Sequence, residues 1–207
     1  MYKTIIMDVD GTLIDTEKAV LGSLQKMLAI EYNKTMELEE LEFVWGIPGS
    51  SSLPVLGIED TEKGDILWNV YMKEFMDSIH VFAGIRELLS TLHKRNIQIG
   101  IVTSKTKIEL EDDFVPFGLM EYLSFVVCAD DTLLHKPNPE PIQKFLEISG
   151  ADPSSSIYIG DTMYDYQCAR DAGVSFGLAV WGAKNNHGIE AKHFFNDPNE
   201  VLAFVSE

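Results

Sequence analysis

Asp8 and Asp10 carry two carboxylates two residues apart, directly after an apolar run that ends at Met7. Side chains alternate between the two faces of a strand, and Gly11 marks the point where the chain can turn out of the sheet. As the backbone begins to turn, both carboxylates can face one pocket beyond the strand end. The alternative interpretation is an ordinary turn, because aspartate and glycine are both common in turns.

Two like charges so close together repel each other, so either one carboxyl group is protonated or a cation lies between the two. Mg²⁺ prefers oxygen ligands such as carboxylates, and we therefore expect Mg²⁺ as the cofactor. Gly11 permits the sharp turn, and the hydroxyl of Thr12 can hold that turn in place. The stretch from Asp8 to Thr12 therefore predicts a metal site at the end of the first strand.

Polar residues also follow the later apolar runs. These residues are Thr103, Ser104 and Lys105 after the second run, Asp130 and Asp131 after the third, and Asp161 and Asp165 after the fourth. Lys136 lies in the proline-rich loop 135–141, which loses little conformational entropy on folding and can hold this lysine rigidly. Ligands bind beyond the carboxyl ends of the strands in open parallel sheets, so the residues after the strands are candidates for one site.

The elements that must position these residues alternate along the chain. Short β-rich runs predict strands over residues 3–7, 98–103, 125–128, 156–160, 175–180 and 193–195. Amphipathic patterns predict helices over residues 84–96, 140–149 and 164–172, and the last two are closed by Gly150 and Gly173. This alternation predicts an α/β, Rossmann-like core, in which helices cover both faces of a parallel sheet.

Residues 18–79 interrupt the alternation, because they contain helical patterns and no convincing strand. Apolar residues recur at helical spacing over residues 18–30, 36–44 and 61–79. We expect an inserted all-helical cap over residues 16–80 and a catalytic core over residues 1–15 and 81–207. The chain would pass between the two lobes near residues 14–17 and 80–84, which makes the cap a candidate lid.

The chain has 207 residues, of which 45% are apolar, and a formal net charge of −17. This negative charge argues against nucleic-acid and membrane partners. We expect neither a signal peptide nor a membrane span, because the apolar runs are too short. Cys128 and Cys168 have no metal-type spacing, so we expect buried reduced thiols in a cytoplasmic protein. We also expect a monomer or a weak homodimer.

Four short motifs resemble those of the haloacid dehalogenase (HAD) superfamily, specifically its phosphatases with a small helical cap, such as phosphoglycolate phosphatase. The motifs are Asp8-x-Asp10-Gly11-Thr12, Ile101-Val102-Thr103, Lys136-Pro137, and Gly160-Asp161 with Asp165. They occur in the family's order, and the resemblance covers essentially the whole chain. Four motifs in the expected structural context are far more specific than any one motif alone.

The resemblance implies hydrolysis of a phosphoric monoester in two steps. Asp8 would attack phosphorus and form an aspartyl-phosphate. Asp10 would protonate the leaving alcohol and then activate the water that hydrolyses the intermediate. Thr103 would donate a hydrogen bond to the phosphoryl group, and Lys136 would offset the charge on that group and on Asp8.

The resemblance also implies a ligand set for Mg²⁺ and a group of substrate contacts. Asp8, the backbone carbonyl of Asp10 and Asp161 would bind the ion. Asp165 would ligate it directly or through a water molecule. Further residues expected around the substrate are Gly11, Thr12, Ser104, Lys105, Trp45 and Gly46.

Several of these residues have a second interpretation. Lys105 can be a solvated lysine at the start of a helix, and Ser104 stays undecided. Asp130 and Asp131 are more typical of turn caps than of metal ligands. The loop 45–49 either contacts the substrate or only joins two cap helices. The aromatic residues expected in the core of the cap itself are Trp45, Trp68, Tyr71 and Phe75.

The HAD scaffold supports several reactions, so the choice among them rests on single positions. Asp10 favours phosphate-ester chemistry over dehalogenation, because a leaving halide needs no proton. Val20 stands where mutases of the β-phosphoglucomutase type carry a histidine, which weakens the mutase alternative. We expect a small phosphorylated metabolite similar to phosphoglycolate as the substrate. Pyrophosphate, a sugar phosphate and a nucleotide monophosphate stay open, as does a binding protein without turnover.

Overall fold

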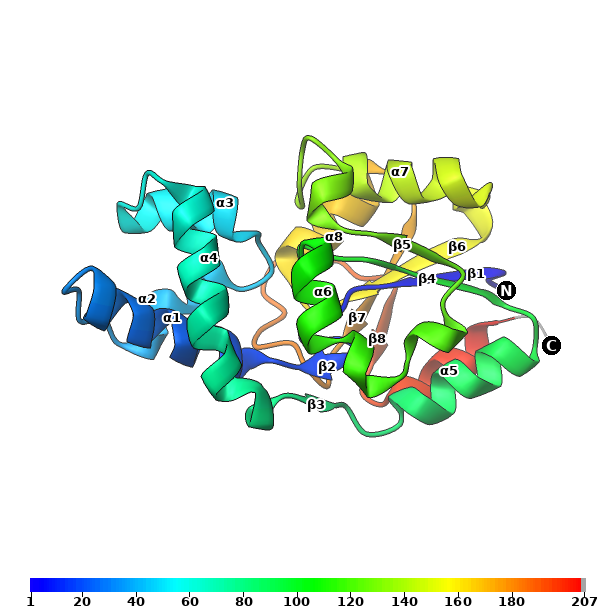
Figure 1. The fold of residues 1–207 in the computed structure, drawn as a ribbon. Coiled ribbons are helices and arrows are strands. Elements are labelled where there is room, and N and C mark those ends of the chain that lie inside the picture. The colour runs from blue at the N-terminus through cyan, green and yellow to red at the C-terminus, as the bar shows by residue number, and fades with distance from the viewer. Residues whose placement is uncertain (206–207) are drawn as a thin grey trace.

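A six-stranded sheet forms the centre of the larger part of the molecule in this computed structural model, which describes residues 1–205 (Figure 1). Its strands are β1 (Thr4–Met7), β4 (Gln98–Val102), β5 (Phe125–Val127), β6 (Ser156–Gly160), β7 (Ser175–Ala179) and β8 (His193–Phe195). Their order is β5-β4-β1-β6-β7-β8, and every neighbouring pair is parallel. The predicted parallel sheet is confirmed.

The register of the sheet brings the polar strand ends to one edge. Met7 of β1 lies opposite Ile101 of β4 and Ile159 of β6. These three strands therefore end side by side. The residues that follow them leave the sheet at the same edge, which is where ligands bind in open parallel sheets.

Helices cover both faces of the sheet because the side chains of each strand alternate between two hydrophobic clusters. Ile5 and Met7 belong to one cluster and Ile6 to the other. Packed against the first face are α5 (Ile85–Lys94), α6 (Lys107–Asp113) and the 3₁₀ helix Pro198–Phe204. Against the second face pack α7 (Glu140–Ser149) and α8 (Met163–Asp171). Figure 1 shows α5 and α7 on opposite sides of the strands.

The smaller part of the molecule is helical and lies beyond one end of the sheet, at the left of Figure 1. Its helices are α1 (Glu17–Glu31), α2 (Leu38–Leu41), α3 (Gly49–Ser52) and α4 (Thr61–Met72). We call residues 17–78 the helical segment. It has a hydrophobic cluster of its own, which includes Leu24, Leu28 and Leu53.

Two helices of this segment are shorter than the patterns predict. The helix predicted over residues 36–44 is α2 followed by the 3₁₀ turn Glu42–Val44. The helix predicted over residues 61–79 ends as an α-helix at Met72 and continues as the 3₁₀ helix Lys73–Ser78. Tighter turns of this kind are common at helix ends, and apolar spacing does not distinguish them from an α-helix.

A second, two-stranded sheet forms where the chain enters and leaves the helical segment. β2 (Ile14–Asp15) pairs antiparallel with β3 (His80–Val81). Both strands fall in the predicted connections 14–17 and 80–84. Strands of two residues carry no readable periodicity, so the sequence pattern indicated only connections at these positions.

Candidate active site

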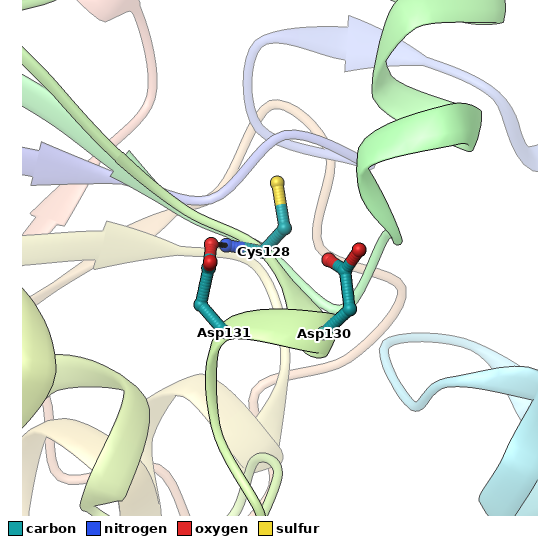
Figure 2. Close-up of side chains that lie close together, drawn as sticks. All are labelled: Cys128, Asp130 and Asp131. Atoms are coloured by element: carbon teal, nitrogen blue, oxygen red, sulfur yellow. Dashed lines mark hydrogen bonds between the residues drawn. The ribbon is translucent and has the colours of Figure 1, made fainter.

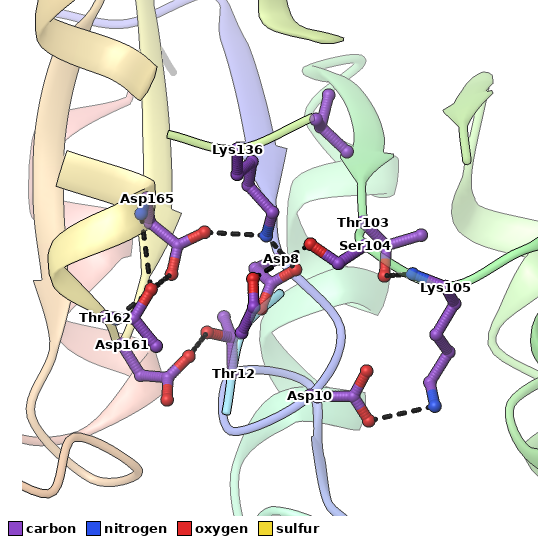
Figure 3. Close-up of polar contacts among 12 residues, drawn as sticks. Asp8, Asp10, Thr12, Thr103, Ser104, Lys105, Lys136, Asp161, Thr162 and Asp165 are labelled. Atoms are coloured by element: carbon purple, nitrogen blue, oxygen red, sulfur yellow. Dashed lines mark hydrogen bonds and ion pairs between the residues drawn. The ribbon is translucent and has the colours of Figure 1, made fainter. Parts of the chain in front are cut away.

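Three buried carboxylates meet at the carboxyl edge of the sheet (Figure 3). Asp8 follows β1, Asp161 follows β6, and Asp165 lies in the first turn of α8. One carboxylate oxygen from each lies within 4.8 Å of the others, and the three residues are at most 2% exposed. The structure therefore brings together three of the acids that the sequence singles out; we call them the acidic cluster.

Lys136 lies inside the acidic cluster and offsets part of its charge. Its ammonium group is 2.8 Å from Oδ1 of Asp8 and 2.7 Å from Oδ1 of Asp165. It also donates to the hydroxyl oxygen of Tyr158 at 3.2 Å. The two carboxylates raise the pKa of Lys136 against the opposing effect of burial, so it carries a positive charge.

Asp165 holds Lys136 in place rather than presenting a free carboxylate. Its Oδ1 accepts hydrogen bonds from Lys136 and from the hydroxyl of Tyr158, at 2.7 and 2.9 Å. Its Oδ2 accepts from the backbone N and the hydroxyl of Thr162, at 3.0 and 2.5 Å. A direct bond from Asp165 to a metal ion would displace one of these donors.

Tyr158 and Thr162 contact the acidic cluster, although the sequence predicts no site role for either. Tyr158 lies inside a buried strand, where nothing in the sequence shows that its hydroxyl reaches Lys136 and Asp165. Thr162, in contrast, forms a capping box with Asp165 at the start of α8. The spacing of a threonine three residues before an acid is the signal that predicts such a box.

Asp161 is held by donors from two distant parts of the chain. Thr12 donates its hydroxyl to Oδ1 at 3.2 Å, and Trp45 of the helical segment donates its indole N–H to Oδ2 at 2.9 Å. Gly11 lies directly beside this carboxylate with φ at +76°, and a Cβ atom there would lie 2.3 Å from Oδ2. Only glycine fits this position, for reasons of both conformation and space.

The charges of the acidic cluster call for a cation. Burial, above all, raises the pKa of Asp8 to about 7, and burial together with Asp165 and Asp8 raises the pKa of Asp161 well above its usual range. A single lysine does not balance three carboxylates. Hard oxygen donors in a buried group are what Mg²⁺ prefers, so the donor set of Asp8 and Asp161 fits that ion.

Asp10 faces a different group from the acidic cluster. Its Oδ1 accepts a hydrogen bond from the hydroxyl of Thr16 at 2.5 Å and lies 3.0 Å from the ammonium of Lys105. Lys105 also pairs with Asp113 at 2.7 Å. The interpretation of Lys105 as a solvated lysine is wrong, because its side chain is 8% exposed and turns back from the start of α6 into the site.

Asp113 and Thr16 were not predicted as site residues. Asp113 ends α6 eight residues after Lys105, and Thr16 lies in the connection to the helical segment. Thr103 is 3% exposed, and its hydroxyl accepts a hydrogen bond from the backbone N of Lys105 at 3.2 Å. Of the predicted group after β4, Thr103 and Lys105 are thus buried, and Ser104 is half-buried.

A cavity of about 80 Å³ lies between the carboxyl edge of the sheet and the helical segment. From the sheet side it is lined by Asp8, Asp10, Ser104, Lys105, Glu109, Asp113 and Lys136. From the helical segment it is lined by Val20, Val44, Trp45, Gly46, Ile47, Pro48, Gly49, Trp68, Asn69 and Met72. The nucleophile and the acid/base group that the sequence predicts thus line the same cavity.

The loop 45–49 does more than join two helices. Trp45 contacts Asp161, and the carbonyl oxygen of Gly46 accepts a hydrogen bond from the hydroxyl of Ser104 at 2.9 Å. The expectation that Trp45 packs in the core of the helical segment is therefore wrong. Trp68 and Tyr71 do pack there, whereas Phe75 packs against the cluster on the sheet.

A second group of potential ligands, Cys128, Asp130 and Asp131, is used to cap turns (Figure 2). Asp131 accepts a hydrogen bond from the backbone N of Cys128 at 2.9 Å, and Asp130 accepts one from the backbone N of Lys107 at 3.2 Å. Burial raises the pKa of the Cys128 thiol to about 12, so the thiol stays protonated. The predicted capping role is confirmed for Asp131, which caps the turn 129–131, whereas Asp130 instead accepts from the first residue of α6. Both Cys128 and Cys168 are buried free thiols.

Among the described residues, no helix is both long enough and apolar enough to cross a membrane.

Comparisons with known proteins support the family resemblance. Residues 5–179 match the haloacid dehalogenase-like hydrolase family. Pyrophosphatase PpaX of Halalkalibacterium halodurans is 30% identical over 201 residues, which cover 96% of this chain and 91% of that protein. Pyrophosphatase PpaX of Oceanobacillus iheyensis is 26% identical over 212 residues, which cover 99% and 97%.

A solved structure from Lactobacillus plantarum, provisionally named a phosphoglycolate phosphatase, has the same fold. It is 29% identical, it superposes with a TM-score of 0.90, and the match covers 99% of this chain and 100% of that one. The match to the family spans most of the sequence, including the strand ends that carry the acidic cluster. The chain therefore belongs to the haloacid dehalogenase-like hydrolase family and is a phosphatase.

Proposed function

We propose that this phosphatase removes phosphate from a small phosphorylated metabolite through a covalent intermediate on Asp8, with Mg²⁺ as its cofactor. The observation that carries the proposal is that Asp8, its ion-pair partner Lys136 and Asp10 all line the same cavity. The proposed nucleophile, its charge partner and the proposed acid/base group therefore all surround the space where a phosphate ester can bind.

The first step is the transfer of the phosphoryl group to Asp8. A phosphate ester is anionic, so its charge must be offset before a carboxylate oxygen can approach phosphorus. Lys136 supplies one positive charge beside Asp8, at 2.8 Å. The oxygen–phosphorus bond to Asp8 forms as the bond to the leaving alcohol breaks. Asp10 donates the proton that the leaving oxygen takes up.

The second step is hydrolysis of the aspartyl-phosphate. Asp10, now deprotonated, takes a proton from a water molecule, and the water oxygen attacks phosphorus. The bond between Asp8 and phosphorus breaks, which releases inorganic phosphate and restores both aspartates. The contacts of Asp10 with Thr16 and Lys105 keep its carboxylate directed at the cavity during both steps.

Asp8 and Asp161 are the side chains that would hold Mg²⁺, with the backbone carbonyl of Asp10 as a further ligand. When bound, the ion offsets the negative charge that gathers on the phosphoryl oxygens. The hydrogen bonds of Asp165 favour an indirect role for this residue, in which it orients Lys136. This leaves Asp161 as the acid that sequence and geometry both favour as the second carboxylate ligand.

The helical segment would act as a cap that closes over the substrate. Its loop 45–49 already reaches the sheet side through Trp45 and Gly46, and its two connections pair as β2 and β3. A cap this close leaves room for a small substrate only. The domain bounds, a cytoplasmic location, and a monomeric or weakly dimeric state stay predictions.

Hydrolysis is favoured over phosphoryl transfer within a sugar phosphate. Val20 lines the cavity where the mutase alternative calls for a histidine, and no histidine lines the cavity in the described part of the chain. The names of the relatives make phosphoglycolate and pyrophosphate the reference substrates. We keep a phosphoglycolate-like metabolite as the first compound to test.

The proposal is tested by measuring phosphate release from a panel of phosphorylated metabolites, with MgCl₂ and with EDTA. We expect turnover that depends on the metal ion and is abolished by Asp8→Asn. Asp77→Asn serves as the matched control, because Asp77 is exposed and lies outside the cavity lining. Equal turnover by the Asp8→Asn variant and the wild type would refute the proposed nucleophile.

A further inference from the structure

Two carboxylates of the cavity wall have no part in the proposed mechanism. Glu109 and Asp113 lie four residues apart on α6, and both line the cavity that Asp8 and Asp10 share. Residues at this spacing present their side chains on the same face of a helix. The wall beyond Asp10 is therefore acidic, although the substrate that must bind there is an anion.

Asp113 has an oxygen atom without a hydrogen-bond donor. The residue is 3% exposed, and its Oδ2 pairs with Lys105 at 2.7 Å. Its Oδ1 is buried and has no partner among the described residues. A buried carboxylate oxygen without a donor is unfavourable, so a rotation of the Asp113 side chain that brings Oδ1 to an O–H or N–H group of a ligand in the cavity would be stabilised.

Glu109 has a free acceptor that, unlike Oδ1 of Asp113, is not buried. Its Oε2 accepts hydrogen bonds from the backbone N and the hydroxyl of Thr106 at 2.7 and 2.9 Å, as part of the capping box of α6. The second oxygen of this half-buried carboxylate accepts no hydrogen bond from a described residue. The wall thus offers acceptors from both acids.

The cations of the cavity are already paired. Lys105 lies between Asp10 and Asp113, and Lys136 lies between Asp8 and Asp165. These two lysines are the only positively charged side chains that line the cavity in the described chain. Lys136 is beside the proposed nucleophile, where the phosphoryl group binds. A second anionic group on the substrate would face Glu109 and Asp113 without a free cation.

We propose that the cavity selects phosphate esters whose leaving group donates hydrogen bonds and carries no negative charge, such as a polyol or an amino alcohol. This inference rests on the proposed function and narrows its substrate class. A negative charge on the leaving group is repelled by the acidic wall, and electrostatic repulsion of this kind is a common source of specificity. The carboxylate of phosphoglycolate and the second phosphate of pyrophosphate are both disfavoured.

Three compounds of nearly equal size isolate the effect of leaving-group charge. Phosphoglycolate, 2-hydroxyethyl phosphate and phosphoethanolamine differ mainly in bearing a carboxylate, a hydroxyl or an ammonium group. We expect kcat/KM to be roughly tenfold or more higher for the hydroxyl and ammonium compounds than for phosphoglycolate, because like charges in a partly buried site repel strongly. Pyrophosphate, measured alongside, should also be a poorer substrate than these two.

Variants test whether the acidic wall causes this preference. Asp113→Asn, alone and with Glu109→Gln, should raise kcat/KM for phosphoglycolate relative to phosphoethanolamine by about tenfold, because the repulsion is removed. Asp113→Asn alone keeps the capping box of α6, so its result stands if the double variant folds poorly. Glu111→Gln is the matched control on the same helix, since Glu111 is exposed and outside the cavity lining.

The possible outcomes separate this inference from the proposed function. Turnover that needs the metal ion and Asp8, but is fastest with phosphoglycolate or pyrophosphate, overturns the inference and leaves the proposed function standing. An unchanged preference in the Asp113→Asn variant also overturns the inference. Absence of metal-dependent turnover with all four compounds and the wider panel overturns both.

Discussion

Trp45 donates its indole N–H to Oδ2 of Asp161 across 2.9 Å, in a buried contact that joins the helical segment to the acidic cluster. One partner is a proposed Mg²⁺ ligand after β6, and the other begins the loop that closes the cavity. This hydrogen bond therefore links closure of the proposed cap to the position of the proposed metal ligand. A change at Trp45 should affect both.

Trp45→Phe keeps most of the aromatic surface and removes the indole donor. A hydrogen bond to an ionised carboxylate, as Asp161 would be when it binds Mg²⁺, contributes about 1.5–3 kcal/mol, so the ratio of the closed to the open form should fall by about tenfold or more. Limited proteolysis of the connections 14–17 and 80–84 should speed up accordingly, because cleavage follows the population of the open form.

The matched control for this variant is Trp181→Phe. Trp181 also donates its indole N–H at 2.9 Å, but to the backbone oxygen of Thr12, outside the helical segment. This control should leave the proteolysis of the two connections unchanged. Equal acceleration by both variants would show that Trp45 contributes only to general stability.

Gly11→Ala should abolish tight Mg²⁺ binding. The new Cβ would lie 2.3 Å from Oδ2 of Asp161 and force this carboxylate to move. Gly118→Ala is the control, because Gly118 has a similar φ of +71° and a Cβ added there would have no atom within 4 Å. Both variants lose about 1–2 kcal/mol through backbone strain, but only Gly11→Ala should weaken Mg²⁺ binding in calorimetry. Equal Mg²⁺ affinity in the two variants would contradict the proposed ligand role of Asp161.

Lys136→Met should destabilise the fold strongly. It leaves Asp8 and Asp165 buried without their cation, and breaking a buried ion pair in this way costs about 3–5 kcal/mol. Lys144→Met breaks only the exposed pair with Glu147 and should change the free energy of unfolding by less than about 1 kcal/mol. Urea denaturation of both variants measures the difference, and comparable losses would contradict the structural role of Lys136.

The contribution of Asp8 to the stability of the metal-free protein should fall as pH rises from about 4 to about 7. Burial raises the pKa of Asp8 from 3.8 to about 7, so between these values the folded state binds more protons than the unfolded state. Mg²⁺ competes with the proton for this carboxylate, and its stabilising effect should grow as pH rises through about 7. Thermal unfolding in EDTA and in MgCl₂ measures both effects. In the Asp8→Asn variant the Asp8 contribution should be absent. If this variant and the wild type show the same dependence of stability on pH, the raised pKa does not belong to Asp8.

Most of the sheet and the sheet-side acids could be predicted from the sequence because they depend on local patterns. Strand periodicity located β1 and β6, and the position of Asp8 and Asp161 directly after them follows from the rule that ligands gather at the carboxyl edge. The proline-rich loop 135–141 marked Lys136 as a rigidly held lysine, but the role of this residue required the family resemblance.

The contacts between distant segments could not be predicted in the same way. The buried pairing of Lys105 with Asp113 depends on how α6 packs on the sheet, and the bond from Trp45 to Asp161 spans 116 residues of sequence. Tyr158 appears in the sequence as an ordinary strand residue, and only the three-dimensional fold brings its hydroxyl to Lys136. Sequence patterns report burial well and side-chain partners poorly.

The central claim is that the carboxylate of Asp8 accepts the phosphoryl group. Borohydride reduces an acyl phosphate to an alcohol, so quenching the enzyme with borohydride during turnover would convert a phosphorylated aspartate into homoserine. Peptide mass spectrometry of the protein treated with substrate and MgCl₂ should find homoserine at position 8, and none in samples without substrate. Turnover without any homoserine at position 8, or with homoserine at another aspartate, would contradict this mechanism.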